Sequence, residues 1–150
     1  MNIFRKLFGW KGSDVQPYSK EQAHENIEAM NSVLFQQAMD LLNDGSPDRA
    51  FQMMKTVAES GRHVDAIFNL GMFHIRGIGT DVNVGEGIKW LTKAAEAGDD
   101  QAAYNVAIFY HDGKIVERDL HKALYWYKVS ADLGNHKAMF EYAKLVDMVD

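Results

Sequence analysis

The sequence contains no cysteine and only two prolines among its 150 residues. The absence of cysteine excludes disulfide bonds, thiolate metal sites and a cysteine nucleophile. Average usage would place roughly seven prolines in a chain of this length. Because proline breaks helices, its scarcity, together with abundant Ala, Leu, Met, Glu and Lys, predicts a mostly helical chain.

Positive charge is also scarce, since 16 Lys and Arg stand against 21 Asp and Glu, for a net charge of −5. An acidic chain is a poor candidate for nucleic-acid binding, which depends on neutralising phosphates. No apolar run approaches the roughly 20 residues of a membrane-spanning helix, and the first residues lack the apolar core of a secretory signal. We therefore expect a globular, cytoplasmic protein that binds no nucleic acid.

The first 13 residues differ from the rest of the chain, because they contain Arg5, Lys6 and Lys11 but no acidic residue. Residues 12–22 are polar and contain Gly and Pro, so we interpret residues 1–25 as an amphipathic segment and linker. Two hypotheses fit the segment: a weak membrane-surface anchor at the inner face of the membrane, or a short helix that packs on the protein body. On a helix its apolar side chains would share one face, with Trp10 at the edge of the group Ile3, Phe4, Leu7 and Phe8.

A repeat with a period of 36 residues dominates the remainder of the chain. When the sequence is aligned with itself at an offset of 36 residues, seven of the 33 aligned pairs from 66/102 to 98/134 are identical. Trp90 with Trp126 and Gly98 with Gly134 are among them. Chance would give roughly two identities at average residue usage. A third copy begins at Ala138, and a shortened copy precedes the others. The repeat domain is therefore predicted over 26–150, with copies at about 31–61, 62–98, 99–134 and a partial copy at 135–148.

Each copy is predicted to form two helices joined by a glycine-containing loop. In the first strong copy these helices span 64–76 and 84–97, and in the second they span 101–111 and 120–133. Asn83 and Asp119 have the residue types and positions of helix N-caps, and glycines permit the positive φ that ends a helix. Such helix pairs bury their apolar faces only when stacked, so the pattern predicts an α-solenoid. The recurring Trp90 and Trp126 are expected to be buried between helices.

The repeats resemble the Sel-one-like repeat family, whose members are longer relatives of tetratricopeptide repeats. The resemblance implies a right-handed α-solenoid of about three helix pairs plus a terminal helix. It also implies a non-enzymatic, adaptor-type module that binds protein partners, mostly in bacteria. His74, Gly87, Leu91, Ile115 and Ser130 depart from the family pattern, and His74 is expected to pack between repeats. The first strong copy matches the pattern at Ala66, Leu70, Gly71, Gly77, Gly79, Trp90, Ala94, Ala95 and Gly98, and the second at Ala102, Ala107, Tyr110, Gly113, Asp119, Lys122, Ala123, Trp126, Tyr127, Ala131 and Gly134.

The sequence shows no catalytic constellation. No two of the six histidines form an HExxH or HxH arrangement, and there is no nucleophile elbow or Walker loop. Gly77-Ile-Gly79 lacks the third glycine and the preceding strand of a dinucleotide-binding motif, so we interpret it as a helix connection. We expect no catalytic, cofactor-binding or metal-ligating residues.

The predicted partner-binding surface follows the first helix of each pair, which lines the concave side of helical solenoids. An apolar or aromatic stripe there would receive a peptide or helix, although helical spacing also fits a partly buried core. Within binding functions the alternatives are a toxin-neutralising immunity or inhibitor protein, an adaptor anchored to the membrane by residues 1–11, and a homodimer through the terminal helix. The predicted partner-binding residues are Phe68, Met72, Ile75, Tyr104, Ile108, His111 and Phe140.

Overall fold

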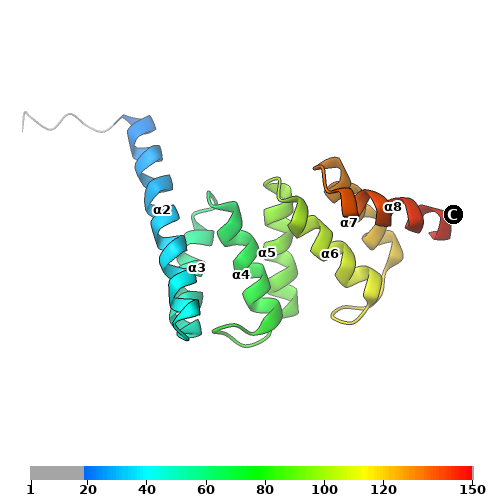
Figure 1. The fold of residues 1–150 in the computed structure, drawn as a ribbon, viewed down its shortest axis with the longest axis horizontal. Helices are drawn as coiled ribbons and strands as arrows, with labels where there is room; N and C mark the ends of the chain where they lie inside the picture. Colours follow the sequence, from blue (N-terminus) through cyan, green and yellow to red (C-terminus); the bar gives the residue numbers. More distant parts are fainter. Residues whose placement is uncertain (1–18, 150) are drawn as a thin grey trace, which may run out of the picture.

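The computed structural model describes residues 19–149, which form seven α-helices and no strand. The all-α prediction is confirmed for this part of the chain. Figure 1 shows the helices following one another from one end of the molecule to the other. The helices are α2 (Lys20–Asn43), α3 (Pro47–Glu59), α4 (Val64–Arg76), α5 (Val84–Glu96), α6 (Asp100–Asp112), α7 (Leu120–Asp132) and α8 (His136–Val149).

Local sequence signals mark where the helices begin and end. The side chains of Asn83 and Asp119 accept hydrogen bonds from the backbone N–H three residues ahead, at 3.0 Å in both cases, so both predicted N-caps are confirmed. Ser46 is the N-cap of α3 and precedes Pro47, but its side chain makes no capping hydrogen bond. Gly77 and Gly113 follow α4 and α6 with φ of 68° and 67°, a left-handed conformation that L side chains rarely adopt.

The helices pack in sequence order, each against the one before and the one after. The pairs α2–α3, α4–α5 and α6–α7 are three repeats, and α8 packs on α7 as the first helix of an incomplete fourth. Small residues occupy the tightest positions: Ala66, Ala102 and Ala138 recur every 36 residues and each is fully buried. This arrangement is an α-solenoid of three pairs plus a terminal helix, as predicted.

The repeat tryptophans are less buried than expected. Trp90 and Trp126 are only half-buried, whereas the residues that follow them, Leu91 and Tyr127, are 0% and 2% exposed. The prediction that both tryptophans are buried between helices is therefore wrong. One residue along a helix is a rotation of 100°, which turns Leu91 and Tyr127 into the core and leaves each indole at its margin.

The N-terminal part of the described chain departs from the expected linker. Ser19 caps α2, and the helix begins at Lys20, so residues 20–25 are helical. The predicted anchor residues Phe4, Leu7, Phe8 and Trp10 lie outside the described residues. Within residues 19–149, no helix combines the length and the apolar character needed to cross a membrane.

Candidate protein-interaction surface

Three aromatic residues stand at equivalent positions of successive first helices: Phe68 on α4, Tyr104 on α6 and Phe140 on α8. Phe68 and Tyr104 are half-buried, and Phe140 is 64% exposed. Tyr104 also contacts Tyr127 of its own repeat, with ring centroids 5.8 Å apart. The stripe is thus part core and part surface, and its exposure is greatest on α8.

Met72 and Ile108 lie on the same stripe and are both half-buried. The Met72 sulfur lies 3.9 Å from the Asn105 side-chain nitrogen, so the first helices of the two strong repeats meet there. Methionine adapts its shape to what it contacts. Met72 lies one helical turn after Phe68 on α4, and Ile108 lies one turn after Tyr104 on α6, so each adds apolar surface beside the aromatic residue of its own helix.

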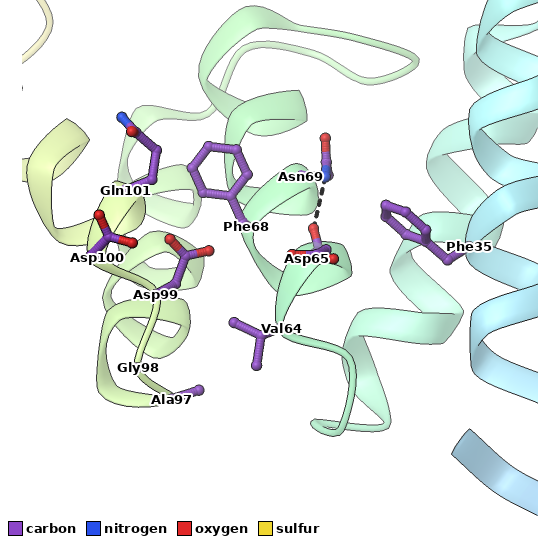
Figure 2. Close-up of a pocket in the computed structure, with 10 residues that line it drawn as sticks. All are labelled: Phe35, Val64, Asp65, Phe68, Asn69, Ala97, Gly98, Asp99, Asp100 and Gln101. Atoms are coloured by element: carbon purple, nitrogen blue, oxygen red, sulfur yellow. Dashed lines mark hydrogen bonds between the residues drawn. The ribbon is translucent and has the colours of Figure 1, made fainter. Parts of the chain in front are cut away.

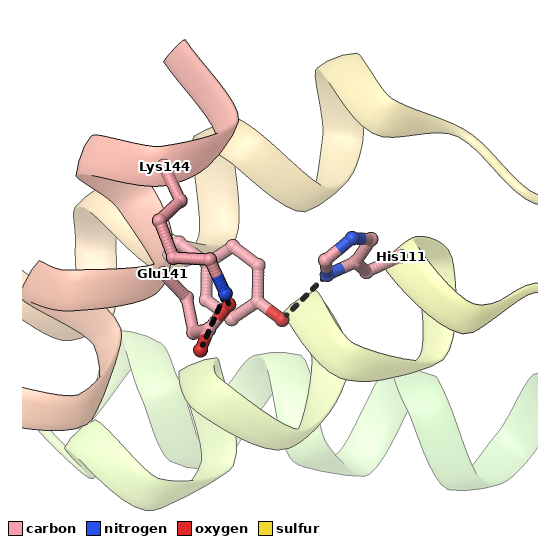
Figure 3. A network of polar contacts seen from close by, with 4 residues as sticks. His111, Glu141 and Lys144 are labelled. Atoms are coloured by element: carbon pink, nitrogen blue, oxygen red, sulfur yellow. Dashed lines mark hydrogen bonds and ion pairs between the residues drawn. The ribbon is translucent and has the colours of Figure 1, made fainter. Parts of the chain in front are cut away.

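Two predicted partner-binding residues face inward. Ile75 is 9% exposed and points at α5, where a Cβ on Gly87 would lie only 2.6 Å from its side chain. The ring nitrogen Nδ1 of His111 lies 3.1 Å from the Tyr127 hydroxyl, a hydrogen bond within the α6–α7 pair (Figure 3). Both side chains turn towards the second helix of their own repeat: Ile75 is buried there and does not line an open groove, whereas His111 is half-buried and its role in partner binding stays a prediction.

The terminal helix α8 carries the most exposed part of the surface. Lys144 lies with its Nζ 5.2 Å from the Phe140 ring centroid. The same Nζ lies 3.2 Å from a carboxylate oxygen of Glu141 (Figure 3). Met139 and Met148 are 49% and 67% exposed, whereas Leu145 packs against α7. A homodimer through this helix stays a prediction.

Next to Phe68 the solenoid forms a cleft of about 630 Å³ between α2, the start of α4 and the turn into α6. Figure 2 shows the Phe68 side chain with Asp99 and Asp100 on one side and Phe35 on the other. The cleft combines two aromatic rings with three carboxylates, and none of its lining residues is basic. The full lining is Phe35, Val64, Asp65, Phe68, Asn69, Ala97, Gly98, Asp99, Asp100 and Gln101.

Sequence reasoning did not identify the cleft. Phe35 stands in the shortened first copy, whose register with the later copies is loose, and Asp99 and Asp100 resemble an ordinary solvated turn. Phe35 is held by stacking on His63, with ring centroids 4.5 Å apart. The aromatic content of α2 could have indicated Phe35, but no local pattern places it beside Phe68.

His74 occupies the predicted packing position between repeats. Its ring meets Phe51 of α3 edge-on, with centroids 5.2 Å apart, and its Nδ1 is buried without a hydrogen-bond partner. Burial lowers the pKa of His74 below the ordinary value of 6.5; Lys55 adds to this and Glu86 opposes it. Among residues 19–149 no cluster of three histidine or acidic side chains could hold a metal ion.

Comparison with known proteins places these features in a family. The family model for the Sel1 repeat matches residues 64–99 and 100–135. Two mammalian relatives, both named DAP3-binding cell death enhancer 1, from Rattus norvegicus and Mus musculus, are each 31% identical over 97 residues. That match covers 65% of this chain but only 18% of each relative.

Solved structures of Sel1-like repeat proteins superpose on the solenoid. A Sel1 repeat protein from Oxalobacter formigenes has a TM-score of 0.66 at 26% identity, over 80% of this chain and 50% of that one. A protective antigen present in uropathogenic Escherichia coli has a TM-score of 0.64 at 28% identity, over 79% of this chain and 26% of that one. Cysteine-rich protein B of Helicobacter pylori shares the fold at a TM-score of 0.60 and 14% identity, over 81% of this chain and 96% of that one.

The helix order, the 36-residue register and the matched repeats agree with one another. Sel1 repeats are generally protein–protein interaction modules and typically serve as non-enzymatic scaffolds. Residues 64–135 are therefore two Sel1 repeats, and the chain has the helical solenoid fold of Sel1-like repeat proteins.

Proposed function

We propose that this protein is a non-enzymatic adaptor that binds a segment of a partner protein along the first-helix face of its repeats. The observation that carries the proposal is the aromatic series Phe68, Tyr104 and Phe140, which recurs every 36 residues. Half-buried aromatic residues in a row supply the anchors that dominate many peptide-binding surfaces. Met72 on α4 and Ile108 on α6 add apolar surface one helical turn after Phe68 and Tyr104.

The partial exposure of these side chains leaves them able to contact a partner. Phe140 is 64% exposed on α8, which has no second helix after it among the described residues. A side chain that faced only solvent would not need to be apolar, so each copy could carry a polar residue at this position. The series instead stays aromatic while its burial falls towards α8.

The proposal is tested by comparing partner capture by the full chain and by the variants Tyr104→Glu and Phe140→Glu. Each should lose the proteins that the wild type retains from a lysate, because a buried carboxylate in an apolar contact is costly. Quantitative mass spectrometry measures the loss. Circular dichroism must show wild-type helix content for the result to report on binding.

Tyr125→Glu is the matched control, because Tyr125 is 60% exposed on the second helix α7. It introduces the same charge on the other helix of the repeat and should retain the captured proteins. Retention by Phe140→Glu and by a folded Tyr104→Glu would place binding elsewhere and defeat the proposal.

A further inference from the structure

The cleft beside Phe68 presents negative charge that the described part of the chain leaves largely uncompensated. Asp99 accepts a hydrogen bond from the Ala102 N–H through Oδ1, at 2.8 Å, and Asp100 accepts one from Asn135 through Oδ2, at 2.7 Å. Each keeps its second carboxylate oxygen, and neither they nor Asp65 form an ion pair within residues 19–149. An occupant that matches this cleft must bring apolar side chains and positive charge together.

The first residues of this chain have that chemistry. Residues 1–13 contain three of the 16 basic residues and none of the 21 acidic ones, so the other 137 residues carry a net charge of −8. Four bulky side chains, Phe4, Leu7, Phe8 and Trp10, stand among the basic residues Arg5, Lys6 and Lys11. The segment and the cleft are thus complementary in charge, and both are aromatic.

The segment is also long enough to reach the cleft. From Ser19, the N-cap of α2, to Phe35 the helix advances about 24 Å, at 1.5 Å per residue. The 11 residues from Phe8 to Ser19 span up to about 36 Å when extended. Phe8 can therefore lie against Phe35 without any change in the helices.

We propose that residues 1–11 bind the cleft of the same molecule. The aromatic side chains of the segment pack on Phe35 and Phe68, and its basic side chains lie at the carboxylates of Asp65, Asp99 and Asp100. The contact is internal to the chain and does not depend on the adaptor function. Where both hold, an external partner that uses Phe68 competes with the chain's own segment.

Paramagnetic relaxation in the full chain tests the contact directly. Because the protein has no cysteine, Asn2→Cys supplies a unique attachment point for a nitroxide. We expect strong loss of amide signal at Phe68 and Gln101, which line the cleft, and none at Leu145 on α8. Loss confined to the first turns of α2, or no loss at all, would contradict the proposal.

Charge removal separates this contact from a purely apolar one. The triple change Asp65→Asn, Asp99→Asn and Asp100→Asn keeps a hydrogen-bond acceptor at each position and removes the charge. It should restore the amide signals of the cleft, as should salt near 1 M, where the Debye length is about 3 Å. The matched control is the triple change Glu117→Gln, Asp132→Asn and Asp147→Asn, which removes three negative charges outside the cleft. It should leave the signal loss at the cleft unchanged.

Two further measurements identify other occupants. In the first, spin-labelled protein at natural nitrogen abundance is mixed with ¹⁵N-labelled protein that carries no nitroxide, so that any loss of amide signal reports contact between molecules. A loss in this mixture as large as the loss within one molecule would overturn the internal contact in favour of a second copy. In the second, anionic phospholipid vesicles are added to the labelled chain. If the vesicles bind the chain but the amide signals of the cleft are not restored, the internal contact is also overturned, because the vesicles and the cleft would then not compete for the segment. Restoration of those amides by the vesicles supports it.

Discussion

The helix pairs α4–α5 and α6–α7 place different side chains at four equivalent positions. In both pairs these positions lie where the first and second helices cross. The α4–α5 pair has Gly71, Ile75, Gly87 and Leu91, whereas the α6–α7 pair has Ala107, His111, Ala123 and Tyr127. Two repeats with one backbone plan therefore use different chemistry to hold their helices together.

Close backbone approach and apolar contact hold the α4–α5 pair together. A Cβ on Gly87 would lie 2.9 Å from the carbonyl oxygen of Gly71, and one on Gly71 would lie 2.8 Å from Leu91. Ile75 fills the space that the missing Cβ of Gly87 leaves. The apparent helix-breaking residue Gly87 is thus required by the packing of its neighbour.

In the α6–α7 pair a polar contact replaces the apolar one. The Tyr127 hydroxyl and His111 Nδ1 are 3.1 Å apart, and the two rings meet edge-on. Burial raises the pKa of Tyr127, so its hydroxyl keeps its proton at neutral pH. The α6–α7 pair packs with alanine at the two positions, 107 and 123, where the α4–α5 pair has glycine. Glycine at the crossing is therefore needed only in the repeat that places Ile75 there.

The largest expected effect is that of Leu91→Ala. Leu91 is fully buried, so the free energy of unfolding should fall by about 2–5 kcal/mol in urea denaturation. Trp90→Ala is the comparison, because Trp90 is only half-buried and its ring also contacts the Lys93 ammonium at 4.2 Å. A greater loss of unfolding free energy for Trp90→Ala than for Leu91→Ala would show that the tryptophan, and not Leu91, is the main core residue.

Gly87→Ala should destabilise the protein although alanine is the better helix former. Overpacking costs about 1–3 kcal/mol, and helix propensity returns up to about 1 kcal/mol of it. The cost should shrink in an Ile75→Ala background, because the closest atoms are then absent. Gly85→Ala is the matched control on the same helix, since a Cβ there meets only the Asn83 side chain at 3.7 Å; destabilisation of equal size at Gly85 would contradict the packing argument.

A smaller effect is expected from Tyr127→Phe, which removes the polar contact of the α6–α7 pair. Loss of one hydrogen bond should lower the free energy of unfolding by about 0.5–1.5 kcal/mol. The same change in a His111→Ala background should cost less, because the bond is already missing. Tyr125→Phe, at a 60% exposed position, should leave stability unaltered.

The smallest effect is a pH dependence of stability that comes from His74 in the α4–α5 pair. His74 stands where the next repeat has Tyr110, and its pKa in the folded protein is below 6.5. The unfolded chain therefore binds the proton more readily, so this contribution to stability is complete above pH 6.5 and is lost as the pH falls towards the lower folded pKa. His74→Tyr should reduce the loss of melting temperature on acidification, and an unchanged pH profile would contradict this.

Much of the fold follows from signals that are local in the sequence. The helix spans 64–76 and 84–97 were expected, and the observed helices are Val64–Arg76 and Val84–Glu96. Caps such as Asn83 and left-handed glycines such as Gly77 act within one helical turn. The start of α2 was missed, because residues 20–25 are polar and exposed and carry no core-facing pattern.

The candidate site was less accessible to sequence reasoning. Phase along a helix placed Phe68 and Tyr104 at the edge of the core, and both are half-buried there. The same phase assigned Ile75 to the groove, but Gly87 on the neighbouring helix admits it to the interior. The cleft joins Phe35, Phe68 and Asp99 from three repeats, and no spacing in the sequence relates them.

The sequence by itself determined the repeat period, the helix order and the family, because each depends on residue types at fixed separations along the chain. Only the tertiary structure decided that Leu91 and Tyr127, and not the tryptophans before them, fill the core. The same holds for Ile75 and for the acidic and aromatic cleft. The physical reason is that burial depends on the distance and rotation between neighbouring helices, which the side chains of both helices set together.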